Sequence, residues 1–147
     1  MKVLRMVLGA VIVAAVPSLG ASADPVHTIA SQIGMSGYDP VTYFDRSKPE
    51  VGRDVWTAKH DGVTYKFWKR TSRDKFKANP VKYLPQFGGH CADNVRKNKI
   101  VAASPTVYEK IQGQLYLFQS QSAKNKFMQD AQQNILTARL RWQLMNS

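Results

Sequence analysis

The strongest constraint on the fold is a hairpin pattern over residues 54–69. Two runs rich in Val, Thr and aromatic residues flank His60-Asp61-Gly62, and Asp-Gly is a preferred pair for a tight hairpin turn. In the second run, Val63, Tyr65 and Phe67 alternate with Thr, Lys and Trp. The pattern predicts two antiparallel strands with one buried face.

Helix signals follow this hairpin and recur at the C-terminus. A capping signal near residue 71 precedes a segment that Pro80 would end or restart as a helix. A short helix is expected within residues 91–99. From Ser122 onward apolar residues recur at helical spacing, which predicts one long helix, or two with a break near Asn134.

Two other segments have extended-chain signals. Residues 107–118 indicate a second hairpin that turns at Gln112-Gly113, and residues 37–44 are rich in β-favouring side chains after Pro40. No internal repeat is evident in the sequence. The order of elements predicts a small α+β domain with antiparallel hairpins, short helices and a long C-terminal helix.

The N-terminal segment has the pattern of a secretory signal peptide. Lys2 and Arg5 precede an apolar run of about 11 residues, shorter than the roughly 20 that a spanning helix needs. Small residues end the segment, so cleavage is expected after Ala23, and an uncleaved anchor is the less favoured alternative. The expected organisation is a signal peptide over 1–23, a polar leader over 24–36 and one domain over 37–147, in a periplasmic or secreted bacterial protein.

The chain is strongly basic. It has 21 Lys and Arg against 10 Asp and Glu, and loss of Lys2 and Arg5 would leave 19 basic residues. Such a charge favours anionic partners: anionic lipid, or an acidic protein. Export argues against nucleic acid as the natural partner. The alternative is that the charge is spread over the surface and serves solubility.

Cys91 is the single cysteine, so no disulfide can form within the chain. Three interpretations stay open. Cys91 would be a reactive thiolate, the candidate catalytic group, if His90 and the basic residues 96–99 stabilise its charged form. It would pair with a thiol-bearing partner protein, or it would be a small buried core residue. Gly88-Gly89 just before it permits a sharp bend of the backbone.

Metal binding has a narrow basis in this sequence. There is no C-x-x-C and no H-x-x-x-H pattern, which excludes a closed zinc site of the usual spacing. Thiolate, imidazole and thioether groups suit copper or another soft metal, and Cys91 with His90 is the candidate pair. The other candidate ligands are His27, Met35, His60 and Met128.

Three strings together resemble the YHS domain family, from about Gly37 to the C-terminal helix: GYDPVTYF, DGVTYKFWKRTSRDKFKANPVKYLPQFGGHCADNV and GQLYLF. Within the second string, DKFKANPVKYLPQFGG is the most specific part. The similarity is greatest to exported bacterial YHS domain-containing proteins, some of which carry selenocysteine. The metal-binding members of the wider family have cysteines where this chain has Thr42, Trp68 and Ser72. The resemblance therefore implies the fold but not that metal site.

The exported subgroup has the pattern Gly-Gly-aromatic-Cys-Ala, which Gly88, Gly89, Cys91 and Ala92 match, while His90 replaces the aromatic residue. Selenocysteine-containing members use the position of Cys91, so the resemblance implies a functional role for this thiol. The first hypothesis is a thiol-redox or soft-metal (copper-type) centre at Cys91. The second is a non-enzymatic basic binding protein in which Cys91 is structural. A self-contained oxidoreductase is disfavoured, because it would need a second thiol.

Overall fold

The computed structural model describes residues 32–147 as a small α+β domain with two antiparallel hairpins, short helices and a long C-terminal helix. This fold class is the one that the sequence predicts. The expected signal peptide and His27 lie outside the described residues. No helix in the described part is long and apolar enough to cross a membrane.

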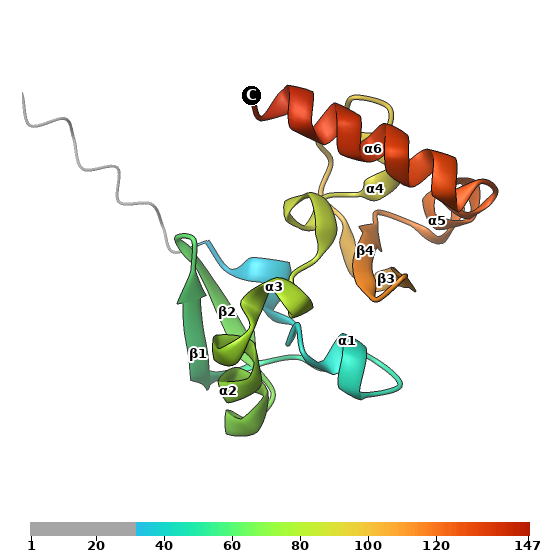
Figure 1. Cartoon of the computed structure of the whole chain (residues 1–147). Coiled ribbons are helices and arrows are strands. Elements are labelled where there is room, and N and C mark those ends of the chain that lie inside the picture. The colour runs from blue at the N-terminus through green and yellow to red at the C-terminus, as the bar shows by residue number, and fades with distance from the viewer. Residues whose placement is uncertain (1–31) are drawn as a thin grey trace, which may run out of the picture.

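The chain forms two lobes in succession, which lie one above the other in Figure 1. The first lobe (residues 32–84) contains η1 (Gly34–Gly37), α1 (Thr42–Asp45), β1 (Arg53–His60), β2 (Val63–Phe67), α2 (Arg70–Ala78) and α3 (Pro80–Tyr83). The second lobe (residues 85–147) contains η2 (Gln86–Gly89), α4 (Ala92–Val95), β3 (Ser104–Ile111), β4 (Gln114–Phe118), α5 (Gln121–Met128) and α6 (Ala131–Met145).

The two lobes repeat one supersecondary unit, so the expectation of no internal repeat is wrong. In each lobe a 3-10 turn and a one-turn helix precede a hairpin and a helix. Both hairpins carry a bulge at the same place: pairing shifts between Arg53 and Thr57 in one, and between Ser104 and Tyr108 in the other. The repeat is also present in the sequence at a spacing of 51 residues, because Gly62, Tyr65, Phe67 and Phe76 recur as Gly113, Tyr116, Phe118 and Phe127.

Both predicted hairpins are present, with their turns at the predicted residues. Asp61-Gly62 and Gln112-Gly113 all have positive φ, between 47° and 78°. A two-residue turn of this kind matches the twist of antiparallel strands, and glycine at its second position adopts it without strain. The turns therefore set the register of both sheets.

The segment Thr42–Asp45 forms helix α1, so the prediction of an extended segment over residues 37–44 is wrong at its end. Asp39 is the cause. Its Oδ1 accepts the N–H of Val41 at 2.8 Å, its Oδ2 accepts the N–H of Trp68 at 2.8 Å, and its carbonyl accepts the Thr42 hydroxyl. These bonds bend the chain into a helical turn despite its β-favouring side chains.

The C-terminal segment is two helices, and the break lies just before the predicted one. Helix α5 ends at Met128, and α6 begins after Asp130, whose carboxylate accepts the N–H of Gln133 at 3.3 Å as an N-cap. Asn134 instead lies inside α6 and donates its side-chain N–H to the carbonyl of Phe127. The break follows from the cap rather than from Asn134.

Tyr43 joins the two lobes. Its side chain is fully buried, with Leu115 and Leu117 of the second lobe in the same apolar cluster. Its hydroxyl donates to the carbonyl of Pro105 at 2.6 Å, and its ring meets that of Tyr108 edge-on at 5.0 Å. Burial raises the pKa of the Tyr43 phenol above its ordinary value, so the hydroxyl stays a donor across the physiological range.

We expect Tyr43→Phe to lower the free energy of unfolding by about 1–2 kcal/mol, because it leaves the Pro105 carbonyl without its partner. Urea unfolding followed by tryptophan fluorescence measures this. Tyr108→Phe is the matched control, since the Tyr108 hydroxyl has no hydrogen bond within the described residues. Its effect should stay within about 0.5 kcal/mol. Equal losses in the two variants would contradict the role of the Tyr43 hydroxyl.

The carboxyl of Asp39 should give the stability a measurable pH dependence. Desolvation is the largest influence on this group and raises its pKa above the ordinary 3.8, while the N–H groups of Trp68 and Val41 act in the opposite direction. The stabilising contribution of neutral Asp39 is therefore complete below pH 3.8 and is lost as the pH rises through the raised pKa.

Asp39→Asn keeps a neutral side chain at this position at every pH. The free energy of unfolding of the wild type, relative to that of this variant, should fall as the pH rises from below 3.8 through the raised pKa of Asp39. Chemical unfolding at several pH values measures the difference. A rise of this difference with pH would show that the backbone hydrogen bonds outweigh the desolvation.

Candidate functional site

Cys91 lies between η2 and α4, and its side chain is in the core of the second lobe. Its exposed fraction is 0%. Its backbone N–H donates to the carbonyl of Val101 at 2.9 Å, and its own carbonyl accepts the N–H groups of Asn94 and Val95. The apolar cluster that contains Cys91 also includes Phe87, Ala92, Val95, Tyr116, Phe118, Ala123, Phe127, Ile135 and Ala138. The thiol is therefore shielded from water.

The turn before Cys91 is the sharp bend that the two glycines predict. Phe87, Gly88 and Gly89 all have positive φ, at 57°, 59° and 80°. The bend returns the chain against the second hairpin, where Cys91 forms an isolated parallel bridge with Leu117. The glycines thus allow the left-handed turn, and the turn places Cys91 in the core.

The repeat identifies the counterpart of Cys91 in the first lobe. There Met35, Ser36 and Gly37 form the same left-handed turn, and Asp39 follows it as Cys91 follows Gly89. Asp39 is also fully buried, where it accepts two backbone N–H groups. In the first lobe this position is therefore structural.

Two of the basic residues after Cys91, Arg96 and Lys97, share an acidic partner. Arg96 and Lys97 bind the two carboxylate oxygens of Asp93, at 2.7 Å and 2.5 Å. The Asp93 side chain is buried, so it needs these cations to balance its charge. Their charge is therefore directed at Asp93, and helix α4 has only four residues. This arrangement gives little support to a thiolate at Cys91.

His90 points away from Cys91. Both residues have extended backbone angles, and adjacent side chains then lie on opposite sides of the chain. His90 is half-buried and lines a cavity of about 150 Å³ with Met35 and Ser36 of the first lobe. Its ring lies 5.9 Å from that of Trp142. The structure thus places the histidine at the junction of the lobes and the cysteine in the core.

The other candidate metal ligands are dispersed. His60 lies at the tip of the first hairpin, 3.3 Å from the carboxylate of Asp61, and Met128 is exposed on α5. Met35 shares a cavity with His90, which gives two donors for a soft metal. Within residues 32–147 no group of three His, Cys, Asp or Glu side chains could hold a metal ion.

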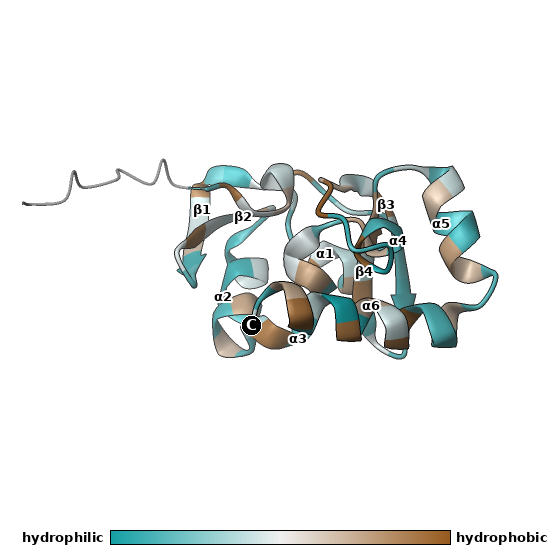
Figure 2. Ribbon diagram, turned by 90° about the horizontal axis from the view of Figure 1, so that it is seen from above, coloured by the Kyte–Doolittle hydropathy of each residue, from teal (hydrophilic) through white to brown (hydrophobic). Residues whose placement is uncertain are grey.

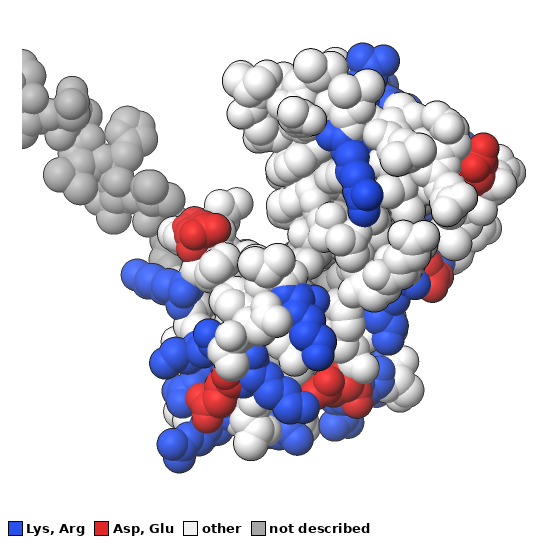
Figure 3. All heavy atoms as spheres, viewed as in Figure 1, with Lys and Arg blue, Asp and Glu red and all other residues white. Residues whose placement is uncertain are grey.

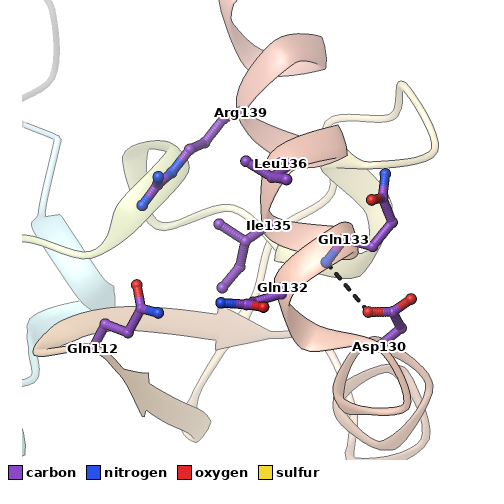
Figure 4. A pocket seen from close by; sticks show the side chains of 7 residues that line it. All are labelled: Gln112, Asp130, Gln132, Gln133, Ile135, Leu136 and Arg139. Carbon is purple, nitrogen blue, oxygen red and sulfur yellow. Dashed lines mark hydrogen bonds between the residues drawn. The ribbon is translucent and has the colours of Figure 1, made fainter.

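A larger pocket, of about 400 Å³, lies where α6 begins (Figure 4). Its polar side chains are mostly amides, and the carboxylate of Asp130 is used in capping α6. Arg139 also lines it, and donates to the side-chain oxygen of Gln114 at 2.7 Å. The residues that line the pocket are Gln112, Asp130, Gln132, Gln133, Ile135, Leu136 and Arg139. This set can hydrogen-bond a polar group, but it pairs no nucleophile with a base.

Basic side chains occur on both lobes (Figure 3). Residues 32–84 contain 11 Lys and Arg against 6 Asp and Glu, and residues 85–147 contain 8 against 3. The two lobes therefore carry the same net charge. The excess of positive charge belongs to the molecule as a whole.

Comparison with known proteins adds no relative. No family model matches the chain, no curated protein matches it, and no solved structure matches it. The resemblance to the YHS family, and the role that it implies for Cys91, remain predictions from the residues quoted above.

The burial of Cys91 leads to a direct prediction. The native protein should resist alkylation by iodoacetamide, and the thiol should react once the chain is unfolded in urea. Cys91→Ala should lower the free energy of unfolding by about 1–2 kcal/mol through lost packing. Cys91→Ser should cost at least as much, because it buries a hydroxyl. Alkylation of the native protein as fast as that of the unfolded chain would contradict the burial of the Cys91 thiol.

Proposed function

We propose that this chain is a non-enzymatic binding protein that engages an anionic surface or partner, with Cys91 as a structural core residue. The observation that carries the proposal is the full burial of Cys91 at the position that Asp39 fills in the first lobe. A thiol-redox or soft-metal centre at Cys91 would require the core of the second lobe to open. Burial therefore favours the structural role.

The charges of the surface support an anionic partner. Eleven Lys and Arg side chains have no acidic partner within the described residues. Four of them contact an aromatic ring or a neutral polar group: Arg53, Lys82, Lys110 and Arg139. The other seven are spread over both lobes: Lys48, Lys59, Lys69, Lys77, Lys99, Lys126 and Arg141. Cations without an internal partner keep their charge available for an external anion. We also propose export to the periplasm or beyond, on the signal-like residues 1–23, where anionic lipid headgroups are accessible.

Two anionic probes test this function: vesicles of phosphatidylglycerol and phosphatidylcholine in equal parts, and poly-glutamate. The protein should bind at least one of them, with an affinity that falls as salt is added. Cys91→Ala should bind equally well under conditions where it stays folded. Sedimentation with vesicles and anisotropy with labelled poly-glutamate measure both.

Two results would overturn the proposal. Binding of neither probe at low salt would remove the anionic partner. Binding that is lost in folded Cys91→Ala would return the function to the thiol.

A further inference from the structure

Helix α6 has an exposed apolar stripe. Leu136, Leu140 and Leu144 follow one another at intervals of four residues, and their exposed fractions are 59%, 57% and 59%. Figure 2 looks onto α6, and hydrophobic residues recur along its ribbon. Residues four apart lie on one side of a helix, so the three leucines form a continuous ridge.

The ridge is distinct from the side of α6 that packs against the protein. Ile135 and Ala138 are buried, and Trp142 and Met145 pack against the same core cluster. These residues supply the apolar packing between α6 and the rest of the protein. The leucines are therefore surplus to the fold, and their exposure to water is unfavourable unless something covers them.

The charges beside the ridge are all positive. Arg139 and Arg141 lie on opposite flanks of it by helical spacing, and residues 131–145 contain no Asp or Glu. The Arg141 side chain has no acidic partner within the described residues. An occupant of the ridge would thus meet leucines in the centre, the unpaired Arg141 on one side, and on the other Arg139, whose guanidinium also donates to Gln114.

A second copy of the chain fits this surface poorly. A twofold axis between two antiparallel α6 helices would place Arg139 beside Arg139 of the copy on one flank, and Arg141 beside Arg141 on the other. No carboxylate of α6 compensates for either pair. The net positive charge of the chain, which remains after loss of Lys2 and Arg5, adds to the repulsion.

We propose that α6 docks on an anionic lipid bilayer, with the leucine ridge among the acyl chains and the two arginines on the phosphates. This inference rests on the proposed function, and it specifies the anionic partner as a lipid bilayer and the binding face as the leucine ridge of α6. A protruding ridge fits a deformable bilayer, whereas a partner helix is recognised by a groove. In Figure 1, α6 lies along the outer edge of the second lobe, where a flat surface can reach it.

A fluorophore on α6 tests the contact locally, in the full chain. An NBD label on Gln143→Cys sits beside the ridge, and a label on Val81→Cys serves as the control on α3 of the first lobe. Cys91 should not react under native conditions, and a stoichiometry of one label confirms this. Vesicles of phosphatidylglycerol and phosphatidylcholine should shift the emission of the Gln143 label to the blue, and leave the Val81 label unchanged. Vesicles of phosphatidylcholine alone should produce only a small blue shift of the Gln143 label.

Substitutions in the ridge give the affinity test, with the Gln143 label as readout. Leu140→Gln should raise the lipid concentration at which the shift is half-maximal roughly tenfold, because it removes one apolar contact. Arg141→Gln should raise this concentration about fivefold. Val81→Gln is the matched control, since Val81 is 76% exposed, and it should have no effect. Binding to poly-glutamate should be unchanged by Leu140→Gln.

The outcomes separate the inference from the proposed function. Vesicle binding without a shift of the Gln143 label, or with no loss in Leu140→Gln, overturns the inference alone. Binding to poly-glutamate but not to vesicles does the same. A dimer that Leu140→Gln abolishes would assign the ridge to a second copy instead. Failure to bind either probe overturns both.

Discussion

The structure depends on one contact between its two lobes, which the buried ring and the hydrogen-bonded hydroxyl of Tyr43 make. Each lobe has a hairpin of only two strands, which is marginal by itself and needs a packed neighbour. Tyr43 supplies that contact from α1: its ring covers the second hairpin and its hydroxyl binds the Pro105 carbonyl. Because the hydrogen bonds of Asp39 hold the start of α1 in place, Asp39 also helps to position Tyr43 against the second lobe.

The internal repeat gives Cys91 a context that the sequence alone does not provide. The same backbone turn delivers Asp39 into one lobe and Cys91 into the other, and both side chains are fully buried. A carboxylate in this position has to be satisfied by N–H groups, whereas a thiol can lie among apolar residues. In the second lobe this position is therefore filled by a side chain that packs among apolar residues and needs no hydrogen bond. This packing agrees with the structural role proposed for Cys91.

The sequence predicts what is encoded locally. Both hairpin turns, the restart at Pro80 and the long terminal helix follow from glycine, proline and periodicity. Thr42–Asp45 was not predictable by propensity, because the distant N–H of Trp68 helps hold the bend. The sequence also does not show that the adjacent residues His90 and Cys91 point to different places, one into the cavity between the lobes and the other into the core. Leu136 and Leu140 share the periodic pattern with buried residues, and only tertiary packing separates the two faces of α6.

The Gly88-Gly89 turn has a further consequence, for the helix at the other end of the chain. A Cβ atom on Gly88 would lie 3.4 Å from the ring of Trp142, and the same ring contacts Phe87 and His90. Trp142 lies on the inner side of α6, so the small size of Gly88 lets the helix approach the turn closely, while the buried Ile135 and Ala138 hold the same side of α6 against the core. The rotation of α6 about its axis in turn decides which residues face outward. The turn before Cys91 is thus one of the contacts that fix this rotation, together with the core residues Ile135 and Ala138, and the leucine ridge faces outward as a result.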